Sequence, residues 1–483
     1  MYLYFIIIIN KIHIKNKIKK IKMFLQIYLF NLLLFFISSE PIFVFEHFRH
    51  GSRAPGFGLI KENPMGEYTD RYGVVWKSNG ELTGIGLRME YTLGVRNRYK
   101  YKKLLSTIFD PKELLVVSSS LNRALTSAQA QLEGMFPPLT GIELKEKELE
   151  NSVPPIPISE SMKKEIQNLG KNALPEKIQV VPIHIFNEKE FDHILSKPSA
   201  CPPLGKLKDE LRNSNVFKDF YIKLNNTYGK ELMAFFKENN TDFLFDYFNV
   251  FFMCDVFLAD YYNDRNLSSF EKAGINLTVF RDLAYEMKNL FLFTSECNEE
   301  IGVLATSPSI KKIIKWMDNR INRDMNGGYA ESNYQEPKFV MYSGHDMTLA
   351  PFELFFKKAF KTKTKFPEFG SNMFLELHKP DGINRKTTID DYYVVYQIDD
   401  EILLNISYVN FKKRINDIVW SDERILQHCQ PPFEGRIVLV VVAGVIVISF
   451  ALFLTASVLC FNTVKNKKSK RYHSINNKEK YLL

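Results

Sequence analysis

Charged and histidine side chains follow three apolar stretches of the sequence, each at a point where a turn begins. The stretches are residues 41–48, 113–117 and 339–342, and their length and β-forming residues predict buried strands that end in loops. Three arginines and two histidines in one place would repel one another unless a multiply charged anion lay between them. A phosphate group is such an anion, and the guanidinium fork pairs with its oxygens. The residues concerned are Arg49, His50, Arg53, Arg123, His345 and Asp346.

The residues between the first two predicted strands indicate a helix that crosses from one to the other. Leu87, Tyr91 and Val95 recur at i, i+4 spacing within residues 82–99, and Thr83 stands where a helix is expected to start. Strands that alternate with helices predict an α/β fold, in which ligands bind at the carboxyl ends of the strands.

The fold class that this pattern predicts is a mostly parallel sheet flanked by helices, with a mainly helical inserted domain. Residues 373–378 and 392–398 alternate in polarity like an antiparallel pair near the sheet edge. The α/β core is expected to comprise residues 40–138 and 336–430. Residues 139–335 are rich in Lys, Glu, Asn and Phe and have helical spacing, so they form the predicted insertion.

Composition and charge exclude two classes of protein. The chain has 483 residues, 45% of them hydrophobic and 14% aromatic, which is enough to build a substantial core and too many for a disordered chain. The net charge of +9 comes from the two ends, residues 1–39 and 462–483, which each carry +6 and leave −3 for the body. Nucleic-acid binding therefore loses its main electrostatic support.

Both basic ends border apolar stretches. Residues 1–39 combine a lysine-rich segment, an apolar run and a pair of serines, which is typical of a signal peptide, whereas an uncleaved signal anchor is the alternative. Met23 directly precedes the apolar run, so residues 1–22 are either an upstream extension or a long basic region. Residues 437–461 contain no charged side chain and precede a lysine cluster, which predicts one C-terminal transmembrane helix.

The predicted topology is that of a single-pass type I membrane protein. Residues 40–436 then form a lumenal or extracellular domain, and residues 462–483 form a cytoplasmic tail. Five N-x-S/T sequons agree with a glycoprotein, at Asn225, Asn239, Asn266, Asn276 and Asn405. Four cysteines outside the predicted span allow two disulfides in three connectivities, namely Cys201, Cys254, Cys297 and Cys429.

The motif RHGSRAP at residues 49–55 resembles the signature of the histidine acid phosphatases, a branch of the histidine phosphatase superfamily with a phosphoglycerate-mutase-like fold. Further segments appear in the order expected of that family. They are residues 82–99, 116–138, 181–185 and SGHDMT at residues 343–348. The resemblance covers roughly residues 41–430 and is thinnest in the predicted insertion.

The resemblance implies an acid phosphatase that hydrolyses phosphate monoesters. It makes His50 the nucleophile that forms a phosphohistidine, and Asp346 the proton donor to the leaving alcohol. It also assigns phosphate binding to the remaining four residues, Arg49, Arg53, Arg123 and His345. No metal or other cofactor is required, because arginines supply the positive charge. His47 and His50 have H-x-x-H spacing, but on an extended strand they point to opposite faces, so a metal site is not expected.

Two alternatives keep the same fold. One is a catalytically silent membrane-anchored ectodomain that binds a ligand or acts as a receptor, and the other is a phosphomutase. The His345-Asp346 pair favours general phosphomonoesters over inositol polyphosphates, because the phytase-type branches typically have another arrangement there.

The sequence leaves partners and destination open. The tail residues Tyr472–Ile475 fit the pattern of endocytic sorting signals read by an adaptor, so a lysosomal or endosomal destination stands beside the cell surface. A homodimer is also left open.

Overall fold

The computed structural model describes residues 40–56, 61–62, 68–185, 201–238, 241–326, 337–379, 387–429, 445–459, 461 and 463–464. The predicted signal peptide and the sorting pattern at residues 472–475 lie outside this part of the chain, as does most of the predicted tail.

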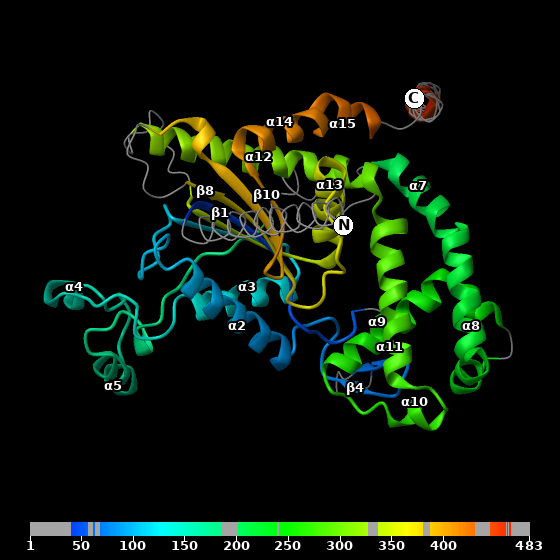
Figure 1. Cartoon of the computed structure of the whole chain (residues 1–483), viewed down its shortest axis with the longest axis horizontal. Helices are drawn as coiled ribbons and strands as arrows, with labels where there is room; N and C mark the ends of the chain where they lie inside the picture. The colour runs from blue at the N-terminus through cyan, green and yellow to red at the C-terminus, as the bar shows by residue number, and fades with distance from the viewer. Residues whose placement is uncertain are drawn as a thin grey trace, which may run out of the picture.

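The core is a seven-stranded mixed sheet with the order β10-β9-β8-β1-β7-β5-β6 (Figure 1). Strands β1, β7, β5 and β6 run parallel, whereas β8, β9 and β10 join the other side of β1 as an antiparallel series. The prediction of a mostly parallel sheet is therefore wrong in this respect. The strands are β1 Pro41–Arg49, β5 Leu114–Ser118, β6 His184–Ile185, β7 Phe339–Gly344, β8 Asn372–His378, β9 Tyr393–Ile398 and β10 Glu401–Ser407.

The predicted antiparallel pair near the sheet edge is confirmed, since β8 pairs with β9 and β9 lies next to the edge strand. Strand β8 pairs directly with the central strand β1, and β10, which the sequence did not predict, forms the edge. Strands β8 and β9 are buried along their whole length, as is most of β1. A strand covered on both faces has an almost continuous apolar sequence.

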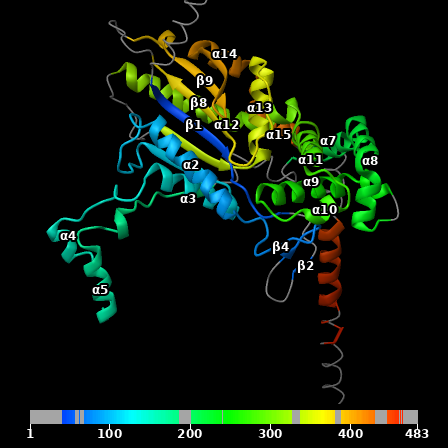
Figure 2. The same cartoon turned by 60° about the horizontal axis from the view of Figure 1, so that its bottom comes forward.

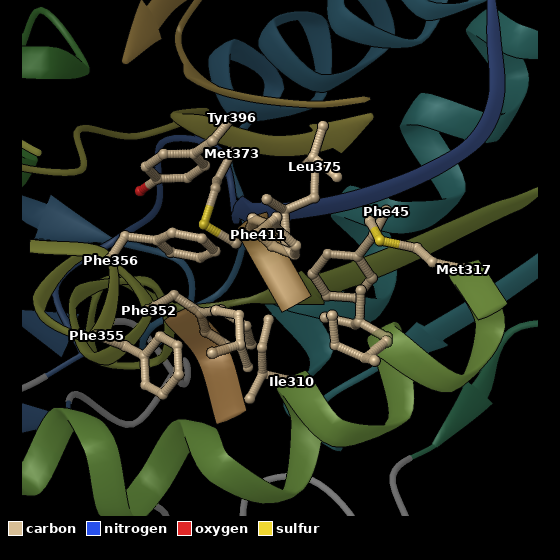
Figure 3. Close-up of a cluster of buried hydrophobic side chains, with 14 of the residues drawn as sticks. Phe45, Ile310, Met317, Phe352, Phe355, Phe356, Met373, Leu375, Tyr396 and Phe411 are labelled. Carbon is tan, nitrogen blue, oxygen red and sulfur yellow. The ribbon is translucent and has the colours of Figure 1, made fainter. Parts of the chain in front are cut away.

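Helices cover both faces of the sheet (Figure 1). Phe43 and Phe45 of β1 face a core cluster shared with α12 and α13, which Figure 3 shows in close-up, whereas Val44 and Phe48 face a second cluster with α3. This alternation follows from the two-residue period of a strand. The covering helices are α2 Gly84–Lys100 and α3 Asn122–Met135 on one side, and α12 Glu299–Met325, α13 Asp346–Phe360, α14 Tyr408–Ile418 and α15 Asp422–His428 on the other.

The helix predicted over residues 82–99 is confirmed, and its N-cap is Thr83. Its buried face differs from the apolar stripe: Leu87 and Tyr91 are exposed, whereas Gly94 is buried. A Cβ atom on Gly94 would lie 1.9 Å from the backbone oxygen of Gln131 in α3. Close approach of the two backbones therefore decides which face of α2 is buried.

The rest of the chain forms a helical layer beside the sheet and an arm that projects from it (Figures 1 and 2). The layer has its own aromatic core and includes α7 Pro202–Arg212, α8 Asn215–Phe236, α9 Tyr247–Tyr262, α10 Ser268–Lys272 and α11 Leu277–Leu290. The arm carries α4 Glu146–Glu150 and α5 Glu160–Leu169. A small second sheet joins β2 Lys61–Glu62, β3 Tyr68–Thr69 and β4 Val75–Trp76.

One disulfide forms instead of two. Cys201 at the start of α7 is bonded to Cys429 after α15, which ties the helical layer to the end of α15 beside the sheet. Cys254 and Cys297 are buried, and neither takes part in a disulfide among the described residues.

Part of the predicted transmembrane stretch falls within the described residues. Residues 445–459 form an exposed helix. Within the described part of the chain, no helix is both long and apolar enough to cross a bilayer.

Candidate active site

The three predicted strand ends meet at one edge of the sheet. Strand β7 lies between β1 and β5, and Ser343 of β7 is in register with Phe48 on one side and with Ser118 on the other. The backbone N–H of His50 donates to the carbonyl of Gly344 at 3.1 Å, so the loop after β1 is fixed against the end of β7. All six candidate residues therefore lie at this edge.

The loop after β1 is held closely against the start of α2. The carbonyl of Ser52 accepts hydrogen bonds from the backbone N–H and the hydroxyl of Thr83, the residue that caps α2. A Cβ atom on Gly51 would lie 2.5 Å from the carbonyl oxygen of Gly86, so only glycine fits there. This packing orients the neighbouring side chain of His50.

The imidazole of His50 is buried and oriented for attack through one nitrogen. Its Nδ1 lies 2.8 Å from the carbonyl oxygen of Gly51, which can only accept, so Nδ1 carries the proton. The lone pair is then on Nε2. Burial, reinforced by the positive charge of Arg49, holds the pKa of His50 well below its ordinary value. The side chain is therefore a neutral imidazole in the free protein.

His345 and Asp346 begin helix α13. His345 is the N-cap, and its ring lies 5.3 Å from that of His50 between centroids. Its Nε2 is 2.8 Å from the hydroxyl of Ser119, while Nδ1 is buried without a hydrogen-bond partner among the described residues. Burial and the charge of Arg123 lower the pKa of His345 to about 3, so this ring is also neutral.

Arg49 is fixed by three contacts. One guanidinium nitrogen lies 3.0 Å from Oδ2 of Asp346, another donates to the carbonyl of Pro367 at 2.9 Å, and the ring of Phe369 lies 4.2 Å from the guanidinium carbon. Burial opposes ionisation of Asp346, but the charges of Arg49 and Lys288 outweigh it and hold the pKa of Asp346 well below its ordinary value. In the free protein Asp346 is therefore a carboxylate.

Two further charged residues, which the sequence did not predict, complete the cluster from the helical layer. Asp255 of α9 accepts two hydrogen bonds from Arg53, at 3.1 and 3.2 Å, and one from Lys288 of α11 at 3.0 Å. Nζ of Lys288 also lies 3.7 Å from Asp346. The sequence held only a weak signal for these two residues, because each is a single charged residue within a helical segment rich in aromatic side chains.

The cluster carries an excess of positive charge. Four cations, Arg49, Arg53, Arg123 and Lys288, surround the two carboxylates of Asp255 and Asp346, and even with Glu368, which lines the same pocket as Arg49 and Lys288, the cations remain in excess. Arg123, in the first turn of α3, has its pKa lowered to about 10 by burial and by the neighbouring Arg53. A dianion is the ligand that balances such a site.

His47 lies apart from this cluster. Its Nε2 is 2.9 Å from the hydroxyl of Thr348, and its ring packs against Tyr342 and Phe352 in the core. The described residues include no group of three or more His, Cys, Asp or Glu side chains arranged to hold a metal ion.

The fold and the site together define an α/β protein with a neutral histidine set among arginines at the carboxyl ends of its parallel strands. Residues 5–397 match the profile of the histidine phosphatase superfamily, branch 2, and the chain belongs to this family. The family predicted from the sequence motifs is thereby confirmed.

Relatives within the family are acid phosphatases. The chain is 26% identical over 322 residues to the lysosomal acid phosphatase of Xenopus laevis, covering 66% of this chain and 62% of the frog protein. It is 24% identical over 342 residues to the prostatic acid phosphatase of Homo sapiens, covering 67% and 73%. The chain thus spans less than two thirds of the frog relative. Among solved structures, the phytase from Citrobacter braakii matches with a TM-score of 0.48 and 13% identity, covering 79% of this chain and 98% of the phytase.

Proposed function

We propose that this protein is an acid phosphatase that hydrolyses phosphate monoesters through a phosphohistidine on His50, with Asp346 as the proton donor. One observation carries the proposal: a buried neutral histidine, with its lone pair on Nε2, stands in a cluster where cations outnumber carboxylates. The acid phosphatase relatives support the same reaction.

In the first step, Nε2 of His50 attacks phosphorus and the bond from phosphorus to the ester oxygen breaks. The hydrogen bond from Nδ1 to the Gly51 carbonyl holds the ring in place and stabilises the positive charge that the ring acquires. Arg49, Arg53 and Arg123 neutralise the phosphoryl oxygens as charge spreads over them in the transition state. His345 donates from the ring nitrogen that the Ser119 hydroxyl leaves free.

The leaving alkoxide takes a proton from Asp346. In the free protein Asp346 is ionised, so substrate binding has to change its state. A phosphate dianion beside Arg49 and Lys288 offsets the cations that keep the carboxyl ionised, which raises the pKa of Asp346 in the complex. Catalysis is then favoured at acid pH, where the complex holds the proton.

In the second step, water attacks phosphorus and the bond to His50 Nε2 breaks. Asp346, now a carboxylate, accepts the proton of that water. Phosphate leaves, the proton on Asp346 passes to the departing phosphate or to solvent as the nearby cations again favour the carboxylate, and both residues return to their starting forms. The same carboxyl group therefore acts as acid and then as base.

We further propose that residues 40–436 form a lumenal or extracellular domain anchored by residues 437–461. The support is the charge-free stretch followed by a lysine cluster, together with the ectodomain disulfide. The two proposed destinations are the lysosome or endosome and the cell surface. An adaptor that binds Tyr472–Ile475 would direct the protein to the lysosome or endosome. A catalytically silent receptor is not favoured, because all six candidate residues are present and gathered at one edge.

The test is hydrolysis of an aryl phosphate by the full-length chain between pH 3 and 8, with a chelator present. Activity that peaks below about pH 6 and disappears in His50→Ala is the expected result. The matched control is Arg424→Gln, because Arg424 is exposed and stacks on Trp420 far from the cluster in sequence. A folded chain without activity would overturn the proposal in favour of a silent binding domain.

A further inference from the structure

A cavity of about 920 Å³ opens beside the candidate active site, between the first half of α2 and the end of α9. Its volume lies within the range of small-molecule sites, roughly 300–1,000 Å³. None of the six catalytic candidates lines it. The lining residues that carry the argument are Ile85, Arg88, Met89, Asn263, Arg265 and Phe369.

Two arginines give the cavity a positive charge. Arg88 and Arg265 are exposed, and neither forms an ion pair within the described residues. The guanidinium of Arg265 stacks on the indole of Trp76 at 4.1 Å, which restrains its position without satisfying its charge. Gly84 and Ile85 add two backbone amides from the first turn of α2, a part of a helix where N–H groups have no partner within the helix.

A buried amide fixes one wall of the cavity. Asn263 is 9% exposed, and its Nδ2 donates to the Ser52 hydroxyl and to the carbonyls of Arg53 and Ala259. These bonds hold the loop after β1 against the end of α9, so the part of the wall that Asn263 forms is preorganised.

The remaining surface of the cavity is apolar. Ile85, Met89, Leu93 and Phe369 contribute to it. A small inorganic anion would leave this surface in contact with water, whereas a ligand with an apolar body would cover it.

We propose that this cavity is a second binding site, which takes an amphiphilic organic anion with an acidic head for Arg88 and Arg265 and an apolar body for the surface of Ile85, Met89, Leu93 and Phe369. The site is separate from the phosphoryl site and goes beyond the proposed phosphatase activity. Phe369 is the wall between the two, since its ring also contacts the guanidinium of Arg49.

The test uses 6-hydroxynaphthalene-2-sulfonate as the probe and calorimetry of the full-length chain in lipid nanodiscs, with empty nanodiscs subtracted. Arg88→Gln and Arg265→Gln are each expected to weaken binding about five- to tenfold, the loss expected when a charge-assisted contact is removed at a partly exposed site. The neutral analogue 6-hydroxynaphthalene-2-sulfonamide is expected to bind the unaltered chain more weakly by a similar factor.

The matched control is Arg424→Gln, which removes an exposed arginine that also stacks on a tryptophan, at 4.0 Å, outside the cavity. This variant is expected to bind the probe as tightly as the unaltered chain does. The unaltered chain is also expected to bind the probe equally well with and without saturating inorganic phosphate. Unfolding midpoints establish that the variants are folded. The proposal is overturned if both cavity variants bind like the control, if the sulfonamide binds equally well, or if phosphate displaces the probe.

Discussion

Asp346 faces two opposing requirements at the level of a single side chain. As the proposed proton donor it has to be protonated when the alcohol leaves, yet Arg49 at 3.0 Å and Lys288 at 3.7 Å stabilise its ionised form. In the proposed reaction the same cations bind the phosphate, so the substrate itself has to reverse the balance. Proton donation by Asp346 can therefore be tested separately from phosphate binding by the arginines.

Replacing Asp346 with Asn should affect substrates according to their leaving group. An alkyl phosphate, whose alkoxide needs a proton, is expected to lose about 10²- to 10⁴-fold in kcat, whereas 4-nitrophenyl phosphate should lose much less. Steady-state kinetics with both substrates at the optimum pH measure the difference. Equal losses for the two substrates would show that Asp346 is not the proton donor.

Replacing Lys288 with Met should shift the pH dependence of kcat. The ammonium lowers the pKa of Asp346, so its removal raises that pKa and moves the alkaline limb of the profile upward by about one pH unit. Lys223→Met is the control, because Lys223 pairs with Glu286 on the exposed side of the helical layer. If the alkaline limb does not move in the Lys288 variant, the charge of Lys288 does not lower the pKa of the proton donor.

At the scale of elements, a pair of buried carboxyl groups links the small sheet to α9. The indole N–H of Trp76 in β4 lies 2.9 Å from Asp70 and 3.2 Å from Asp260. Burial, with Asp70 nearby, raises the pKa of Asp260 to about 9. The native chain therefore keeps a proton that the unfolded chain loses above its ordinary pKa near 4.

Because the native state binds this extra proton, its stability should fall as pH rises from about 4 to about 9. Position 260 cannot titrate in the variant Asp260→Asn, so this fall should be missing from its free energy of unfolding. The difference between the variant and the unaltered chain should therefore grow in favour of the variant by up to about 1 kcal/mol for each unit by which the pH rises. Denaturant unfolding at pH 5, 6.5 and 8 tests this, with the exposed Asp219→Asn as control. Parallel pH curves for Asp260→Asn and the unaltered chain would contradict the account.

The sequence predicted those elements whose pattern is local. Strands β1 and β7 follow from continuous apolar runs, and the start of α2 follows from Thr83. The buried face of α2 could not be predicted, because contacts of Gly94 with α3 determine it. The same holds for the place of β8 beside β1, since strand order depends on contacts between segments far apart in the chain.

The candidate site shows the same division. Arg49, His50 and Arg53 stand in one motif, and their gathering with His345 was predictable because parallel strands end at the same edge. Asp255 and Lys288 were missed because they come from two helices of another layer and meet the motif only in the folded chain. The pairing of Cys201 with Cys429 across 228 residues has no local signal either.

At the scale of the whole molecule, the sheet and the helical layer each contribute part of one charge cluster. The sheet supplies the histidines and three arginines, and the layer supplies Asp255 and Lys288. The disulfide between Cys201 and Cys429 joins the layer to the end of α15, which packs beside the sheet. Reducing or removing it is expected to lower the free energy of unfolding by about 2–5 kcal/mol.

That loss is measurable by denaturant unfolding of the variant Cys201→Ser/Cys429→Ser. The control is Cys254→Ser, which removes a free buried thiol and leaves the disulfide intact. A double variant as stable as the unaltered chain would show that the bond does not hold the two parts together.

In the proposed reaction the phosphoryl group passes through His50. This is tested by mixing the full-length chain with a ³²P-labelled monoester at pH 5, quenching rapidly without acid, and identifying the labelled residue. We expect at most one phosphoryl group per chain, stable to alkali and labile to acid, located on His50 and missing in His50→Ala. A chain that turns over substrate with no phosphohistidine, or with the label on another residue, would contradict the proposed reaction.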